Sequence, residues 1–110
     1  MAMTQTLPSS IAAYFDAANR RDLDRAAAQF SADARVRDES RDHIGRAAIE
    51  AWLKQTGDAY DFHADPGPAE YRDGAVFVPA TVSGSFPGSP IALTYRFGMD
   101  ADRIASLEIA

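Results

Sequence analysis

Hydrophobic residues in the first half of the chain recur every three or four positions, which is the spacing of amphipathic helices. A first helix is predicted to start at residues 9–10, two serines that offer an N-cap, and to end near residues 19–21. Asp22 can cap a second helix. A third helix is predicted over residues 46–56, with Gly57 as the stop at its C-terminus.

The second half of the chain alternates between apolar and polar residues, which is the pattern of half-buried strands. Strands are predicted over residues 34–39, 60–64, 70–72, 75–86, 91–99 and 104–109. Residues 40–43 and 65–68 are predicted as polar loops, and the Asp-Gly pair 73–74 as a turn. Strands that follow helices indicate an α+β protein, with the helices packed on one face of a curved antiparallel sheet. A chain of 110 residues is expected to form a single domain, residues 1–110.

The strand predicted over residues 75–86 carries two further signals. Its start, AVFVPATV, is apolar on both faces, so we expect its outer face to be covered, as a homodimer through the sheet would do. Pro79 cannot donate a ladder hydrogen bond, so it is expected to mark a bulge or an edge.

The strand predicted over residues 34–39 turns an aspartate toward its apolar side. Every second side chain of a strand points to the same face, so Arg35, Arg37 and Glu39 share the polar face. Asp38 shares the opposite face with Val36. A carboxylate on an apolar face is a candidate for chemistry, because an apolar cavity raises its pKa and makes it a stronger base.

Composition narrows the class of protein. The chain is 46% hydrophobic and 25% charged, which argues against disorder. A net charge of -5 with scattered basic residues argues against nucleic acid as a partner. No apolar run approaches the roughly 20 residues of a membrane span, and the start, MAMTQTLPSS, lacks the pattern of a secretory signal. The absence of cysteine permits a cytoplasmic location, which we expect.

Three stretches resemble one known superfamily: YFDAANRRDLDRAAAQFSADARVRDE, IGRAAIEAWL and PIALTYRF with DRIASLEI. They are similar to the nuclear-transport-factor-2-like superfamily, and within it to the SnoaL-like and ketosteroid-isomerase-like branch. The resemblance covers residues 9–109. It implies a cone, in which a strongly bent antiparallel sheet wraps around three N-terminal helices and leaves an internal pocket, with Asp38 inside. Members of this superfamily include isomerases, cyclases, dehydratases, hydrolases and non-catalytic proteins, so the fold alone does not name a reaction.

Ketosteroid isomerases use three side chains, and the resemblance carries over two of them. Their catalytic base lies eight residues after the Phe of the second helix, where Asp38 follows Phe30. Their main oxyanion donor, a tyrosine, lies eight residues before the Asp of the DLD turn, where Tyr14 precedes Asp22. The third group, a protonated aspartic acid, is replaced here by Leu93. Losing one oxyanion donor is expected to slow that reaction about a hundredfold or more.

Each of these residues also has a structural interpretation. Asp38 could instead cap the loop that follows its strand, and Tyr14 could be a core residue whose hydroxyl reaches a backbone carbonyl. His43 could act as an acid or base beside Asp38, hydrogen-bond to it, or be a simple loop residue. Its spacing from the second histidine does not suggest a metal site, so no metal and no cofactor are expected.

The pocket of such a fold is expected to be apolar and to suit a small, hydrophobic, ring-containing molecule. Its predicted lining residues are Val36, His43, Trp52, Phe62, Leu93, Tyr95 and Phe97. Phe30 is expected to be core. Two functions remain open. The first is an isomerase or cyclase that abstracts a proton beside a carbonyl, with Asp38 as base and Tyr14 as donor. The second is a non-catalytic binder of a small hydrophobic ligand, or a dimeric scaffold, which Leu93 favours.

Overall fold

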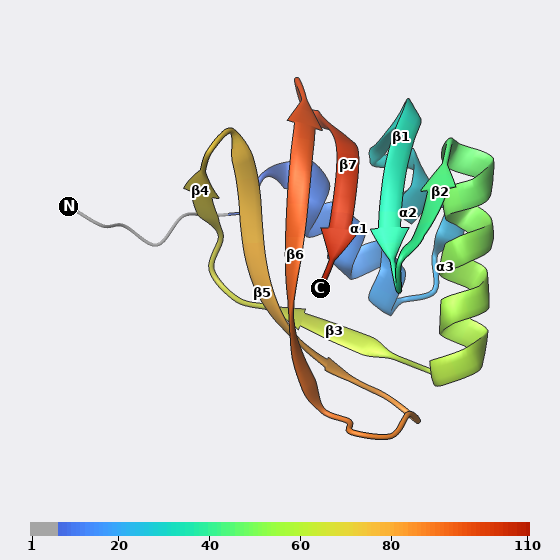
Figure 1. Cartoon of the computed structure of the whole chain (residues 1–110). Coiled ribbons are helices and arrows are strands. Elements are labelled where there is room, and N and C mark those ends of the chain that lie inside the picture. The colour runs from blue at the N-terminus through green and yellow to red at the C-terminus, as the bar shows by residue number, and fades with distance from the viewer. Residues whose placement is uncertain (1–6) are drawn as a thin grey trace.

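The computed structural model describes residues 7–110 and contains three helices and seven strands (Figure 1). The elements, in chain order, are α1 (Ser9–Asn19), α2 (Leu23–Ala28), β1 (Phe30–Asp38), β2 (Arg41–Ile44), α3 (Arg46–Tyr60), β3 (His63–Pro66), β4 (Glu70–Arg72), β5 (Ala75–Ser83), β6 (Ile91–Asp100) and β7 (Arg103–Ile109). Most of the N-terminal segment on which the absence of a secretory signal was judged lies outside the described residues.

All seven strands belong to one sheet, in the order β2-β1-β7-β6-β5-β3, with β4 also paired to β5. The helices lie on one side of it, α1 and α2 behind the strands and α3 beside β2 (Figure 1). The predicted α+β class and the bent sheet around three helices are therefore confirmed. One pair departs from the antiparallel prediction, because β1 and β7 run parallel. That pairing joins strands far apart in the sequence, which alternation within each strand does not reveal.

The first helix starts at Ser9 as predicted, but the serine N-cap is wrong, because Pro8 occupies the N-cap position and no side chain caps that end. Asp22 caps α2 as predicted, since its Oδ1 accepts a hydrogen bond from the backbone N–H of Arg25 at 3.2 Å. The prediction that Gly57 ends α3 is wrong, because the helix continues to Tyr60 and ends at Asp61, which has a left-handed φ of 46°. A side chain at Gly57 would meet the guanidinium of Arg21, so this glycine makes room for a neighbouring residue instead of ending the helix.

The predicted loop over residues 40–43 is also wrong. Residues Arg41–Ile44 form β2, an edge strand that takes in all but the first residue of that range and pairs antiparallel to β1. The turn between them is only Glu39 and Ser40, which have φ values of 52° and 62°. Two-residue hairpin turns of this kind favour Asn and Gly. The sequence Glu-Ser therefore carries no hairpin signal.

The segment after α3 starts later than predicted. Tyr60 belongs to the helix, and β3 takes in the first two residues of the predicted loop over 65–68. Asn19 holds β3 in place, because its side chain donates to the carbonyl of Ala64 at 2.8 Å and accepts from its N–H at 2.9 Å. Pro79 lies where the outer partner of β5 changes from β3 to β4, and its carbonyl accepts from the N–H of Gly67 at 2.7 Å. Pro79 therefore lies at the junction between two short strands, where its lack of an N–H donor breaks no ladder hydrogen bond.

Candidate active site

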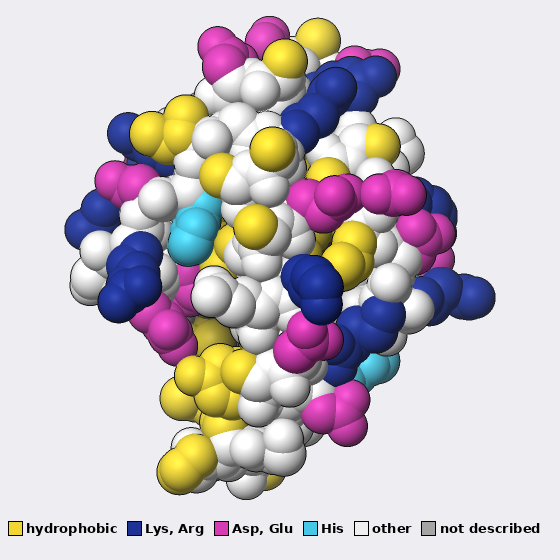
Figure 2. All heavy atoms as spheres, turned by 90° about the vertical axis from the view of Figure 1, so that its right-hand side faces the viewer, with side chains coloured by type: hydrophobic (Ala, Val, Ile, Leu, Met, Phe, Trp, Pro, Cys, Tyr) yellow, Lys and Arg dark blue, Asp and Glu magenta, His cyan; other side chains and the backbone are white. Residues whose placement is uncertain are grey.

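A cavity of about 550 Å³ opens between α1, α3 and the inner face of the sheet. Its lining is largely apolar and comprises Tyr14, Asp38, Glu39, Trp52, Thr56, Tyr60, Phe62, Val82, Phe86, Pro87, Ile91, Leu93, Tyr95 and Ile109. Hydrophobic side chains gather at the foot of the α3 face, below the helix (Figure 2). Figure 1 places the connection between β5 and β6 there. A cavity of this size and character suits a small hydrophobic molecule.

Asp38 lies at the end of β1 and is half-buried on the wall of this cavity. The strand keeps the predicted parity, because Arg35 and Arg37 are exposed whereas Val36 is buried. The Asp38 carboxylate accepts a hydrogen bond at Oδ2 from the indole Nε1 of Trp52, at 3.1 Å. This bond comes from α3, so the side chain turns toward the helix layer and does not cap the hairpin that follows it.

Tyr14 lies on α1 with only 2% of its surface exposed, and it lines the same cavity. Three phenylalanine rings surround its ring in edge-on contacts: Phe15 at 5.3 Å, Phe30 at 5.6 Å and Phe97 at 6.0 Å between centroids. Within residues 7–110, no hydrogen bond occupies its hydroxyl. The alternative in which this hydroxyl reaches a backbone carbonyl is therefore not what the structure shows.

Burial raises the pKa of Tyr14 well above its ordinary value of about 10, and the nearby Tyr95 and Asp38 raise it further. The phenol therefore keeps its proton at neutral pH and can donate it in a hydrogen bond. The effect of the Asp38 charge on the pKa of Tyr14 agrees with the two side chains lining the same cavity.

Four of the seven predicted lining residues border the cavity: Trp52, Phe62, Leu93 and Tyr95. Val36 and Phe97 do not, because both are fully buried in the core behind it. Phe30 is likewise fully buried, as expected.

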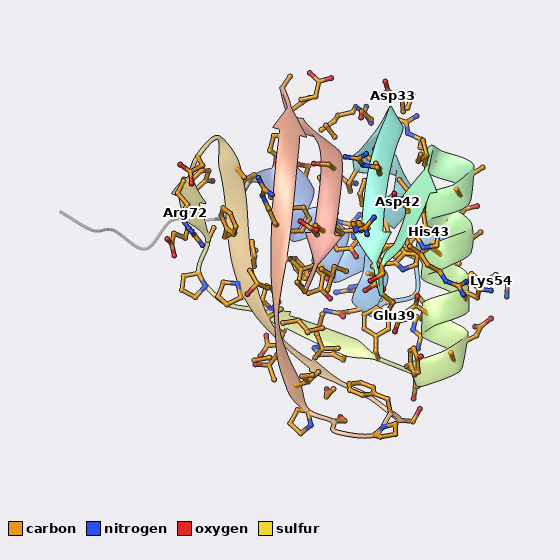
Figure 3. All side chains as sticks on the ribbon, in the orientation of Figure 1. Asp33, Glu39, Asp42, His43, Lys54 and Arg72 are labelled. Carbon is orange, nitrogen blue, oxygen red and sulfur yellow. The ribbon has the colours of Figure 1, made fainter. Side chains whose placement is uncertain are left out.

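His43 lies on β2 beside α3 (Figure 3), and its ring centroid is 5.9 Å from that of Trp52. It lines a second hollow of about 440 Å³ between this hairpin and α3, which shares Asp38 and Trp52 with the cavity. His43 therefore lies next to Trp52 but outside the cavity that Tyr14 and Asp38 line.

Several lining residues escaped the sequence analysis. Thr56 and Tyr60 follow Trp52 at spacings of four and eight, so they lie on the same face of α3. The helical spacing indicates both residues only if the helix is extended beyond Gly57, where it was predicted to end. Phe86 and Pro87 come from the connection between β5 and β6. The strand predicted over residues 75–86 is therefore too long, because β5 ends at Ser83 and leaves Phe86 in the connection.

Within residues 7–110, no three His, Cys, Asp or Glu side chains come together as a metal-binding group. None of the helices in this part of the chain is long and apolar enough to cross a membrane.

The family model for the SnoaL-like domain matches residues 11–107, nearly the whole chain. The chain belongs to the SnoaL-like family. A candidate polyketide cyclase from Sinorhizobium meliloti is 38% identical, with a TM-score of 0.92 and coverage of 99% of this chain and 100% of that one. No curated protein matches the chain.

Two more distant structures show the same fold. A protein from Catenulispora acidiphila with a ketosteroid isomerase-like fold is 20% identical, with a TM-score of 0.82 and coverage of 96% of this chain and 86% of that one. The epoxide hydrolase/cyclase-like enzyme SalBIII, which takes part in pyran ring formation in the polyether salinomycin, is 20% identical. Its TM-score is 0.79, and the match covers 92% of this chain and 86% of SalBIII. The resemblance found in the sequence is confirmed.

Proposed function

We propose that this protein is a cofactor-independent isomerase or cyclase that abstracts a proton beside a carbonyl of a small hydrophobic molecule. One observation carries the proposal: Asp38 and Tyr14, from different elements, line the same apolar cavity. The polyketide cyclase and cyclase-like proteins among its structural neighbours support this class of reaction. A cytoplasmic location stays a prediction.

In this mechanism the Asp38 carboxylate takes a proton from the carbon next to the carbonyl. The electron pair of the broken C–H bond forms the C=C bond of the enolate, and the π pair of the carbonyl moves onto its oxygen, which becomes an enolate oxygen. The Tyr14 hydroxyl donates a hydrogen bond to that oxygen as its charge develops. In an isomerase, the protonated Asp38 returns the proton to a different carbon. In a cyclase, the enolate carbon attacks a second carbonyl of the same molecule, whose oxygen takes up the proton.

Isomerisation of a β,γ-unsaturated ketosteroid, followed by the absorbance of the conjugated enone, tests the proposal. Wild type is compared with Asp38→Asn, which keeps the shape of the side chain and removes the base. Asp42→Asn is a matched control, because Asp42 lies on the neighbouring strand and pairs with Arg37 at 3.1 Å outside the cavity. Turnover that disappears only in Asp38→Asn supports the proposal.

A second function has one observation in its favour. Leu93 stands where ketosteroid isomerases carry their third catalytic group, and it lines the cavity as an apolar residue. A non-catalytic binder of a small hydrophobic ligand fits this wall equally well. Equal activity in wild type and Asp38→Asn contradicts the role of Asp38 as the base. Absence of activity in both proteins contradicts the steroid reaction and favours the binder. Ligands are then sought by thermal shift with ring-containing ketones and hydrocarbons.

A further inference from the structure

The cavity holds a second phenol that the sequence analysis treated only as lining. Tyr95 lies on β6, where it pairs with Val78 of β5 and Ile109 of β7, and its side chain is 3% exposed on the inner face of the sheet. It borders the same cavity as Tyr14 and Asp38. Leu93 is two residues earlier in the same strand and therefore points to the same face. A hydrogen-bond donor thus stands beside the position where the third catalytic group is missing.

The same two phenylalanines hold the rings of Tyr14 and Tyr95. The ring centroid of Phe15 is 5.3 Å from that of Tyr14 and 5.0 Å from that of Tyr95. The centroid of Phe97 is 6.0 Å from that of Tyr14 and 6.2 Å from that of Tyr95. Shared packing of this kind fixes both rings before a ligand arrives, which is what an effective donor site requires.

Neither hydroxyl is used by the fold. In the described part of the chain, no hydrogen bond is made by the hydroxyl of Tyr95 or by that of Tyr14. Among residues 7–110, the fully buried side-chain polar atom without a partner is Ser10 Oγ, so neither tyrosine hydroxyl is sealed in the core. Both are accessible from the cavity that they line, and an acceptor on a ligand can reach them there.

We propose that Tyr95 is the second oxyanion donor of this site, so that one ligand oxygen accepts hydrogen bonds from both Tyr14 and Tyr95 while Asp38 faces the adjacent carbon. The catalytic meaning of this inference rests on the proposed function. It also narrows the ligand class to ring compounds with an enolisable carbonyl, or its enol, whose oxygen can reach both hydroxyls.

The electrostatics of the site agree with a donor role. Burial raises the pKa of Tyr95 far above its ordinary value, and the negative charge of Asp38 raises it further. The phenol therefore remains protonated throughout the pH range in which the carboxylate can act as a base. Two protonated donors and one carboxylate are the complement that enolate formation needs.

Binding of 2-naphthol tests the proposal without any catalysis, because its oxygen on a flat ring system resembles an enolate oxygen. Naphthalene is the matched ligand, since it has the same rings without the oxygen. Affinities are measured by fluorescence for wild type, Tyr14→Phe, Tyr95→Phe and the double variant. Each Phe variant keeps the ring and its packing, and melting temperatures show whether the fold is preserved.

The expected result is that each single variant loses about tenfold or more in affinity for 2-naphthol and keeps its affinity for naphthalene. In turnover of the ketosteroid, Tyr95→Phe is expected to lower kcat about a hundredfold. Wild-type affinity for 2-naphthol in Tyr95→Phe overturns the proposal. So does a wild type that binds both ligands equally, because two prepared donors must favour the oxygenated one. A loss of affinity for 2-naphthol in Tyr95→Phe, without ketosteroid turnover in the wild type, leaves Tyr95 as a donor and removes only the proposed reaction.

Discussion

The indole Nε1 of Trp52 lies 3.1 Å from Oδ2 of Asp38, and this bond joins α3 to the end of β1 at the wall of the cavity. An indole N–H can only donate, so the carboxylate must accept. The bond fixes the direction in which the carboxylate points, and Trp52 itself is 6% exposed and held by the core. Trp52 is therefore a positioning residue for Asp38.

Replacing Trp52 by Phe keeps an aromatic ring and removes the donor. Hydrogen bonds to charged groups contribute about 1.5–3 kcal/mol, so we expect Trp52→Phe to lower the free energy of unfolding by about that amount. Urea denaturation of wild type, Trp52→Phe, Asp38→Ala and the double variant gives the coupling between the two side chains. A coupling energy near zero contradicts the role assigned to this bond.

Stability is expected to fall at alkaline pH. Burial raises the pKa of both Tyr14 and Tyr95 above their value of about 10 in the unfolded chain. Below pH 10 both states hold these protons, so their contribution is fully present. Above pH 10 the unfolded chain loses them first, and the free energy of unfolding falls by up to about 1.4 kcal/mol per pH unit for each tyrosine. Urea midpoints between pH 8 and 11 measure the slope. Tyr14→Phe and Tyr95→Phe must each reduce it, and an unchanged slope contradicts the prediction.

The side-chain amide of Asn19 fixes β3 next to the cavity. It forms two hydrogen bonds with the backbone of Ala64, two residues after the lining residue Phe62. We expect Asn19→Ala to destabilise the protein by about 1–3 kcal/mol, because it leaves a buried backbone N–H and C=O without partners. Asn19→Asp keeps the acceptor and loses the donor, so it should lie between wild type and Asn19→Ala. Thermal unfolding of the three proteins gives the order.

Local patterns predicted most of the fold and the position of Asp38, the proposed base. The 3.6-residue period located all three helices, and the period of two placed Asp38 on the inner face of β1. The errors arose where the local structure depends on residues far away in the sequence, or on a turn without a sequence signal. Arg21 explains a glycine inside α3, and a hairpin turn of Glu39 and Ser40 has no sequence signal. The neighbourhood of Tyr95 and Tyr14 depends on how α1 packs on β6, which no local pattern encodes. The single domain over residues 1–110 stays a prediction.

The outer face of the sheet bears on the expected homodimer. A row of side chains crosses it in register, from Asp42 on β2 to Arg37 on β1, Glu108 on β7 and Arg96 on β6. The charges alternate along this row. The outer face of β5 exposes less apolar surface than the sequence indicated. The ring of Phe77 is covered by the guanidinium of Arg72 at 4.0 Å and by that of Arg96 at 5.7 Å.

We propose that two copies pair through this face, because an alternating row is self-complementary. A two-fold axis reverses the row in the partner, so each positive side chain faces a negative one. Arg96→Glu breaks the alternation and should shift light-scattering masses toward the monomer at micromolar concentration. Lys54→Glu makes the same charge change on α3, on the opposite side of the molecule from Arg72 (Figure 3), and should leave the mass unchanged. A wild type that is monomeric at every concentration contradicts the proposal. Equal masses for wild type and Arg96→Glu would place the contact elsewhere, since a reversed charge at the end of the row sets two negative side chains opposite each other in this pairing.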